Sequence, residues 1–447
     1  MNVDTTDHPA ARAERALGRL CSPVAGLAFQ QPDRGTGEFA IADPTVADLQ
    51  RVVPDAGGDP IEPTVGGGGT TVSAATLSAL GEFLERYSMY WPLADSVGST
   101  HAALVAEGKR VIDLAPLQPY APDALAAAGF EPLDEHTTTE WVQGTTLTDG
   151  EDVFVPVDCV SFAHAHREGA TLPASTSGTA CGSTLAGALR RALYEQVERD
   201  AIMRTWYERR TPTRLDISAL EALDAFRDQI TPHDYRLHVL ELPTPTACHA
   251  VATALVADAD RVPKFRLFAG ADRTLPGAIR DALTETAEGL LQTRYRLAAG
   301  DTPDRDIDID AVYDFDRNVQ YYMGPENYDA VAHLTTGDVR TVDPTDLGTG
   351  ADGDPDDLDP TTPGTVTETA VSKASRRELE KTLDAVTASA DLTPIAVDLT
   401  PDDVRELGMS TAAVYVPELV DITPPALAPV DHPGLDDLTT RDPHPFP

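Results

Sequence analysis

The spacing of hydrophobic and polar residues divides this chain of 447 residues into helix-like and strand-like segments. Hydrophobic residues recur at the spacing of an amphipathic helix from residue 73 onward and in 181–209, 275–299 and 372–390. Apolar runs typical of buried strands occur at 154–162, 247–258, 394–400 and 411–419. Because the two kinds of segment alternate, the pattern predicts a mixed α/β fold.

Shifts in composition predict four segments along the chain. Residues 1–60 combine a short helical pattern at 10–20 with Pro-, Asp- and Gly-rich connectors, and the core is predicted to span 61–340. Residues 341–371 are acidic, rich in Gly and Pro and nearly free of large apolar residues, which is typical of a mobile loop. Residues 372–447 return to helix and strand patterns and are predicted to close the domain.

The charge of the chain excludes several classes of function. Asp and Glu number 73 against 34 Lys and Arg, which gives a formal net charge of −39. Such a surface repels phosphate backbones and anionic membranes, so we expect neither a nucleic-acid nor a membrane role. Only four of the basic residues are lysines, and this acid-rich, lysine-poor composition indicates adaptation to high salt. A hydrophobic content of 41% is ample for a large core and argues against a disordered acidic chain.

No apolar run reaches the length of a membrane span, and the N-terminal sequence has no signal-peptide core, so we expect a cytoplasmic protein. The four cysteines are scattered without a CxxC pair. Buried free thiols are therefore expected, and neither a disulfide framework nor a structural zinc site.

One motif repeats three times along the chain. The pattern A-L-x-E-x-x-E occurs as ALGEFLE, ALYEQVE and ALTETAE, at 79–85, 192–198 and 282–288. Glutamates three residues apart lie on the same face of a helix. A single copy is typical of an ordinary solvated helix face, but three copies predict a shared role for six carboxylates, namely Glu82, Glu85, Glu195, Glu198, Glu285 and Glu288.

Six converging carboxylates would repel one another and therefore require cations. Hard divalent ions such as Mg²⁺ take oxygen ligands from carboxylates and phosphates. The first two copies continue into Arg86 and Arg199, whose guanidinium groups are suited to holding phosphate oxygens. The sequence contains no GxxxxGK[ST] P-loop. The motifs therefore predict a nucleotide site in which carboxylates bind metal and metal binds phosphate.

These motifs resemble the sequence blocks of the YcaO-domain family. SALGEFLERYS (78–88) is similar to the family's first ATP and Mg²⁺ motif, and TSGTACGSTLAGALRRALYEQVERDA (176–201) to its second. AIRDALTETAEGLLQTRYRLAAG (278–300) is similar to the third block, and DLTPDDVRELGMSTAAVYVPELV (398–420) to the closing segment. The resemblance covers about residues 60–447.

The resemblance implies the YcaO mixed α/β fold, ATP and Mg²⁺ as cofactors, and a nucleotide cleft lined by helices that carry the Glu pairs. The six glutamates named above would bind the metal, and the residues that would bind the cofactor are those glutamates with Ser78, Arg86, Ser177, Arg199 and Arg294. The tail PHPFP (443–447) fits the P-x-P-x-P terminus of azoline-forming members. By this resemblance, Arg86 and Arg199 would be catalytic, and the terminal carboxylate of Pro447 would enter the site as a base.

The implied function is that of a SagD-like cyclodehydratase subunit. Such a subunit uses ATP to convert Cys, Ser or Thr of a ribosomal precursor peptide to thiazoline or oxazoline, with phosphate as the leaving group. Its implied partners are the precursor peptide, an E1-like leader-binding protein and a flavin-dependent dehydrogenase, and a homodimer is a further expectation.

Three positions depart from the family pattern. A serine and a glutamate commonly found in the second block are replaced by Ala180 and Gly187, and Gly68 occupies a place where a basic residue is often found. Two alternatives remain beside the cyclodehydratase. One is a YcaO protein that forms thioamides, and the other is a weakened ATP- or partner-binding scaffold.

Overall fold

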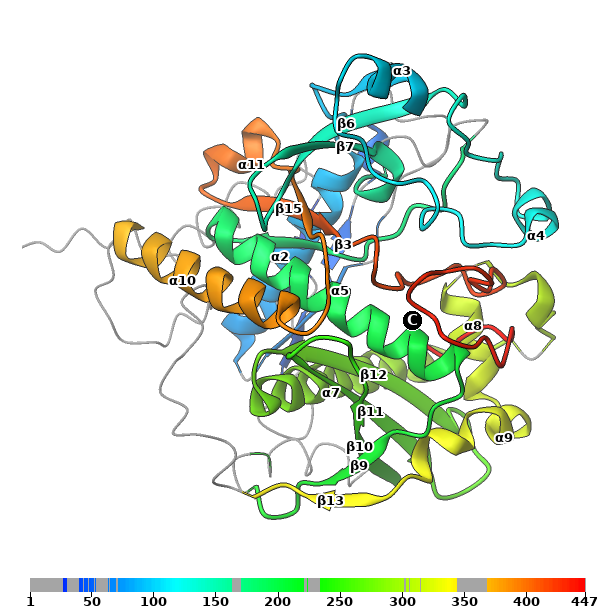
Figure 1. Cartoon of the computed structure of the whole chain (residues 1–447). Helices are drawn as coiled ribbons and strands as arrows, with labels where there is room; N and C mark the ends of the chain where they lie inside the picture. The colour runs from blue at the N-terminus through cyan, green and yellow to red at the C-terminus, as the bar shows by residue number, and fades with distance from the viewer. Residues whose placement is uncertain are drawn as a thin grey trace, which may run out of the picture.

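The computed structural model (Figure 1) describes most of the chain between residues 71 and 446. The described residues are 27–29, 40–42, 44–46, 48–51, 53, 63, 65–69, 71–162, 170–220, 223, 234–300, 303–304, 306–313, 315–343 and 368–446. The helix predicted at 10–20 and most of the acidic segment 341–371 lie outside these ranges. No helix in the described ranges is long and apolar enough to cross a lipid bilayer.

Two antiparallel sheets form the framework. The larger has the strand order β5-β6-β14-β15-β8, and β7 also pairs with β6. Its strands are β5 (Val97–Ser99), β6 (Thr139–Thr146), β7 (Asp152–Pro156), β8 (Thr179–Gly182), β14 (Ile395–Asp398) and β15 (Ser410–Tyr415). Because β14 and β15 lie between β6 and β8, the C-terminal part of the chain completes the centre of this sheet.

The second sheet has the order β12-β11-β10-β9-β13, antiparallel except for the parallel pair β9 and β13. Its strands are β9 (Thr213–Asp216), β10 (Tyr235–Leu242), β11 (His249–Ala257), β12 (Phe265–Asp272) and β13 (Val339–Thr341). Two small ribbons pair β1 (Leu27–Phe29) with β3 (Pro44–Val46) and β2 (Ala40–Ala42) with β4 (Gly67–Gly69).

Three long helices carry the repeated motif. They are α2 (Val72–Tyr90), α5 (Leu185–Tyr207) and α7 (Leu275–Ala299), and each begins after a threonine whose side chain accepts a backbone N–H of the first turn. Such a cap satisfies one of the N–H groups that a helix start leaves unpaired. The other helices are α3 (His101–Ala106), α4 (Pro122–Ala127), α8 (Phe315–Met323), α9 (Tyr328–Val331), α10 (Glu368–Thr387) and α11 (Asp402–Glu406).

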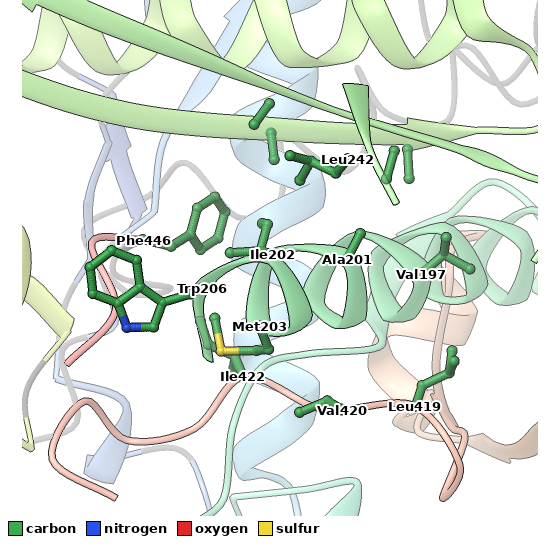
Figure 2. Packing of buried hydrophobic residues seen from close by; sticks show 14 of the residues in the cluster. Val197, Ala201, Ile202, Met203, Trp206, Leu242, Leu419, Val420, Ile422 and Phe446 are labelled. Atoms are coloured by element: carbon green, nitrogen blue, oxygen red, sulfur yellow. The ribbon is translucent and has the colours of Figure 1, made fainter. Parts of the chain in front are cut away.

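Helix α5 lies between the two sheets and joins their cores (Figure 1). One buried cluster contains Val197 and Ala201 of α5, Ala412 of β15 and Ala250 of β11. Figure 2 shows Leu242 of β10 on one side of α5 and Leu419, Val420 and Ile422 of the C-terminal segment on the other. Alternating small and large side chains let the helix approach both sheets closely. The motif on α5 is thus held at the centre of the molecule.

The predicted mixed α/β class and the four predicted helices from residue 73 onward are confirmed, with small shifts of their ends. The strand predicted at 154–162 is wrong in its second half, because β7 ends at Pro156 and a 3₁₀ turn, Val157–Cys159, follows. Proline lacks the N–H that a strand would need there. The strand predicted at 411–419 ends at Tyr415, and Thr341, predicted to begin the loop, is the last residue of β13.

Gly178, in the turn before β8, provides a test of this packing. Its φ is +69°, and an added Cβ would lie 2.2 Å from the Val414 carbonyl oxygen. We expect Gly178→Ala to lower the free energy of unfolding by about 2–3 kcal/mol, since both the backbone and the neighbouring strand oppose a side chain. Gly129→Ala is the control, because Gly129 also has a positive φ, +87°, but open space around it. Equal losses in urea unfolding would contradict the steric account.

Candidate functional site

The first Glu pair lies on the inward face of α2 together with an arginine. Arg86 Nη2 lies 3.4 Å from Glu82 Oε1, and Arg86 Nη1 lies 3.7 Å from Glu85 Oε1. Thr179 of β8 donates its hydroxyl to Glu85 Oε1 at 3.0 Å. The spacing Glu-x-x-Glu-Arg therefore places one guanidinium between two carboxylates of the same helix.

The second pair repeats this arrangement on α5. Arg199 Nη2 lies 2.9 Å from Glu195 Oε1, and Arg199 Nη1 pairs with Glu198. These side chains are largely buried, as are those of the first pair. Each arginine thus offsets part of the negative charge that its two carboxylates carry when both are ionised.

The third pair, on α7, has no arginine directly after it. Glu288 Oε1 accepts a hydrogen bond from Gln292 Nε2 at 3.2 Å. Gly66, just before β4, lies between this pair and α2, and its N–H donates to Glu82 Oε2 at 2.7 Å. A Cβ on Gly66 would lie 2.6 Å from Gln292 Nε2 and 2.9 Å from Glu288 Oε1, so the backbone at Gly66 runs close to the ends of these two α7 side chains.

The three pairs are close enough to influence one another electrostatically. The pKa of Glu85 is raised to about 8, chiefly by burial, which Arg86 opposes and the charges of Glu195 and Glu82 reinforce. Burial also raises the pKa of Glu285 to about 8, with contributions from Glu198 and Glu82. The pKa of Glu198 is raised to about 7, chiefly by burial. The six glutamates of the three pairs and the two arginines are called the Glu cluster below: Glu82, Glu85, Glu195, Glu198, Glu285, Glu288, Arg86 and Arg199.

The donor set of the Glu cluster fits Mg²⁺ held together with a nucleotide. Carboxylates with raised pKa values are stabilised when a cation joins them. Within the described ranges, no three Asp, Glu, His or Cys side chains form the ligands of one metal ion. Mg²⁺ commonly uses one or two carboxylates and completes its shell with phosphates and water, so an all-protein cage is not required.

The other predicted residues lie at different distances from the cluster. Ser78 is exposed, one turn before Glu82 on the same face of α2. Ser177 is buried in the turn before β8 and interacts with Asp421. Arg294 is exposed on α7 and lines a separate surface hollow with Tyr235 and Arg261, so the structure does not bring it together with the glutamates.

The three residues that depart from the family pattern lie in β8, at the start of α5 and in β4. Ala180 is buried in β8 opposite Ala412. Gly187 donates its N–H to the capping Thr184 at the start of α5. Gly68 lies in β4, opposite Ile41 of β2.

The proline-rich tail is anchored beside the Glu cluster. Asn318 Nδ2 of α8 donates to the carbonyl oxygens of His444 at 2.5 Å and Phe446 at 3.1 Å. The guanidinium carbon of Arg199 lies 4.7 Å from the centre of the Phe446 ring, a cation–π contact. Figure 2 shows Phe446 beside Trp206 at the end of α5. Pro447 itself lies outside the described residues.

One residue close to the cluster is not predicted by any sequence motif. Asp421 follows the buried residues Leu419 and Val420, and its negative charge acts on both Arg199 and Glu195. Burial raises its pKa, and Ser175 Oγ donates to its Oδ2 at 3.2 Å. A single acid among 73 acidic residues carries no local pattern. Its place depends on the path of the C-terminal segment along α5.

Comparison with known proteins gives matches over most of the chain. The model of the YcaO family, described as YcaO cyclodehydratase, ATP- and Mg²⁺-binding, matches residues 66–420. An uncharacterized protein from the tfuA 3′ region of Rhizobium leguminosarum bv. trifolii is 28% identical over 248 residues, 53% of this chain and 56% of the relative. The chain thus aligns with about half the length of that curated relative.

Three solved structures share the fold. YcaO from Methanopyrus kandleri, bound with AMPPCP and Mg²⁺, has a TM-score of 0.63 at 20% identity, covering 92% of this chain and 91% of that one. A heterocyclase in complex with substrate and cofactor has a TM-score of 0.68 at 19% identity, covering 93% and 52%. A chain of the Escherichia coli microcin synthetase McbBCD complex has a TM-score of 0.57 at 13% identity, covering 94% and 96%.

Removing Arg199 tests its electrostatic role. We expect Arg199→Met to lower the free energy of unfolding by about 2 kcal/mol near pH 8, because Glu195 and Glu198 lose their counter-charge. Both carboxyls already have raised pKa values, and the loss of Arg199 raises them further. The loss in free energy of unfolding caused by Arg199→Met therefore becomes smaller as the pH falls and the carboxyls take up protons.

The control for Arg199→Met is Arg236→Met, which removes a surface ion pair with Asp258 whose side chains are 67% and 62% exposed. Its loss should change stability little at any pH. Urea unfolding across the pH range measures both variants, and a pH-independent loss in Arg199→Met would contradict the account.

Proposed function

The chain belongs to the YcaO family, and from this premise we propose that it is the ATP-dependent subunit of a peptide cyclodehydratase. The substrate would be a ribosomal precursor peptide in which Cys, Ser or Thr becomes thiazoline or oxazoline. The observation that carries the proposal is the convergence of three Glu pairs and two arginines from α2, α5 and α7.

The chemistry requires a way to expel an amide oxygen. The side chain of the modified residue adds to the preceding carbonyl carbon, and the resulting oxyanion attacks the γ-phosphorus of ATP, so that ADP leaves. Loss of phosphate and of the amide proton then forms the C=N bond of the ring. Phosphorylation is needed because oxide or hydroxide is a poor leaving group from an amide.

The residues of the Glu cluster have defined tasks in this proposal. Glu82, Glu85, Glu195, Glu198, Glu285 and Glu288 would hold Mg²⁺, which neutralises phosphate charge when it is bound. Arg86 and Arg199 already lie among these carboxylates and would turn part of their hydrogen bonding to phosphate oxygens. Both arginines thereby stabilise the charge that develops during phosphoryl transfer.

The anchored tail supports the azoline-forming subtype. Phe446 contacts Arg199. Trp206, Tyr322 and Asn318 donate hydrogen bonds to backbone carbonyl oxygens of the tail, namely those of Asp442, Pro443, His444 and Phe446. A tail held in this way keeps Phe446 against Arg199, which supports the proposal that Pro447 acts as a base at the Glu cluster. We assign the chain on this ground to the SagD-like group.

Partner proteins are part of the proposal. The matched McbBCD chain belongs to a multi-subunit complex. We propose a leader-binding E1-like protein and the precursor peptide as partners, with a flavin-dependent dehydrogenase to oxidise the azolines. ATP and ribosomal peptides are both available in the cytoplasm, where we place the protein.

The direct test incubates the protein with Mg²⁺, ATP, the partner and precursor encoded beside it, and follows the peptide by mass spectrometry. We expect loss of one water per modified residue, with ADP and phosphate formed in step. Glu198→Gln should slow ring formation by about 100-fold, because it removes charge from the Glu cluster. The exposed Glu107→Gln is the matched control and should retain activity.

Other outcomes of the same experiment identify the alternatives. Exchange of an amide oxygen for sulfur, in the presence of a sulfide source, would identify a thioamide-forming protein. Nucleotide binding without ADP formation would identify a scaffold. Deletion of Phe446 and Pro447 should abolish azoline formation, and a thioamide-forming protein should tolerate it.

Proton release gives a second test that does not depend on turnover. Near neutral pH, Glu85, Glu198 and Glu285 hold protons because their pKa values are about 8, 7 and 8. Mg²⁺ lowers these values, so Mg²⁺-AMPPCP binding should release protons between about pH 6 and 8 and release few above about pH 9. Calorimetry in buffers of different ionisation heat measures this release. Glu85→Gln should reduce it, and an unchanged release in that variant would contradict the assignment.

A further inference from the structure

A small hollow lies next to the Glu cluster, between the C-terminal segment and the loops before β6 and β8. It is called the Asp421 pocket here, and its walls include Tyr120, Asp158, Cys159, Ser175, Tyr415 and Asp421. Its free volume is about 40 Å³ for water-sized groups, enough for a few waters or one short side chain and far too small for a nucleotide. The pocket is therefore distinct from a nucleotide site.

The position of Asp421 is fixed from both sides. The Asp421 Oδ1 atom accepts the N–H of Ile422 at 2.7 Å, and Oδ2 accepts the Ser175 hydroxyl at 3.2 Å. The preceding residue is tied to α5, because Val420 N–H donates to Asp200 Oδ1 at 2.8 Å. Asp421 is nevertheless partly accessible, and the pocket provides that access.

The charges around Asp421 connect the pocket to the Glu cluster. On α5, the positive charge of Arg199 favours the ionised form of Asp421, and the negative charge of Asp421 raises the pKa of Glu195. On the pocket side, burial raises the pKa values of Tyr120, Cys159 and Tyr415, and the negative charge of Asp421 raises them further. These three groups therefore stay neutral. Asp421 is thus the carboxylate of the pocket that is coupled to Arg199.

We propose that the Asp421 pocket receives the side chain of the peptide residue that is being cyclised, and that the Asp421 carboxylate accepts its proton. The inference rests on the proposed function. As the O–H or S–H proton moves to Asp421, the oxygen or sulfur forms its bond to the preceding carbonyl carbon, and the C=O π electrons move to the carbonyl oxygen. The oxyanion formed in this step is the one that the proposed function phosphorylates. The small pocket suits Ser, Thr and Cys and excludes larger side chains.

The first test compares Asp421→Asn with Asp436→Asn, an exposed acid later in the same C-terminal segment. Loss of a general base should slow ring formation by about 100-fold or more, leave the affinity for Mg²⁺-AMPPCP unchanged and remove the rise of the rate with pH. Asp436→Asn should behave as the wild type. Undiminished ring formation in Asp421→Asn would overturn the proposal, and so would a parallel loss of nucleotide affinity, which would make Asp421 part of the nucleotide site.

The second test requires no turnover, so it separates this inference from the proposed function. Cys159 lines the pocket, and its slow alkylation by iodoacetamide at alkaline pH can be followed by peptide mass spectrometry. Acetyl-Gly-Ser-Gly-amide should slow this alkylation, and acetyl-Gly-Phe-Gly-amide should not. If the Ser peptide protects Cys159 but the protein forms no azoline, the pocket assignment stands and the proposed reaction is rejected. Azoline formation without selective protection would reject the pocket assignment.

Discussion

The structure depends on keeping several carboxylates close together inside a protein. Burial and mutual repulsion both oppose their ionisation, and Arg86 and Arg199 offset only part of that cost. The arrangement persists because the helices that carry the glutamates are fixed elsewhere, by threonine caps, by the two sheets and by the close approach of Gly66 to α7. Stability of the scaffold therefore maintains a site that would not assemble by itself.

Helix α5 connects the parts of this scaffold. Its hydrophobic residues join the two sheets, while the buried Gln196 and Asp200 accept backbone N–H groups of Val416 and Val420. These two bonds hold the C-terminal segment in register along the helix. The positions of Asp421 and of the tail residue Phe446 both depend on that register. Helix α5 therefore supports both the Glu cluster and the segment proposed to handle the peptide.

The sequence predicted the parts of the site that follow from helical periodicity. Glutamates three residues apart must share a face, and an arginine next to them reaches both, which α2 and α5 both show. The same periodicity explains why Arg294 lies away from the glutamates. Over the nine residues from Glu285 to Arg294 a helix turns by about 900°, which places the two side chains on opposite sides. Asp421 and Asn318 could not be predicted, since each acts through chain segments distant in sequence and neither belongs to a local pattern.

The wide spacing of the three motifs has a consequence for how the protein folds. Glu82, Glu195 and Glu285 are each separated by about a hundred residues, and β14 and β15 must return from the far end of the chain to complete the central sheet. Contacts of this range form late and slowly. A partly folded chain would have intact helices and still hold no assembled charge cluster. Nucleotide and metal would then bind only the finished fold, and would protect it by slowing its opening without accelerating its formation.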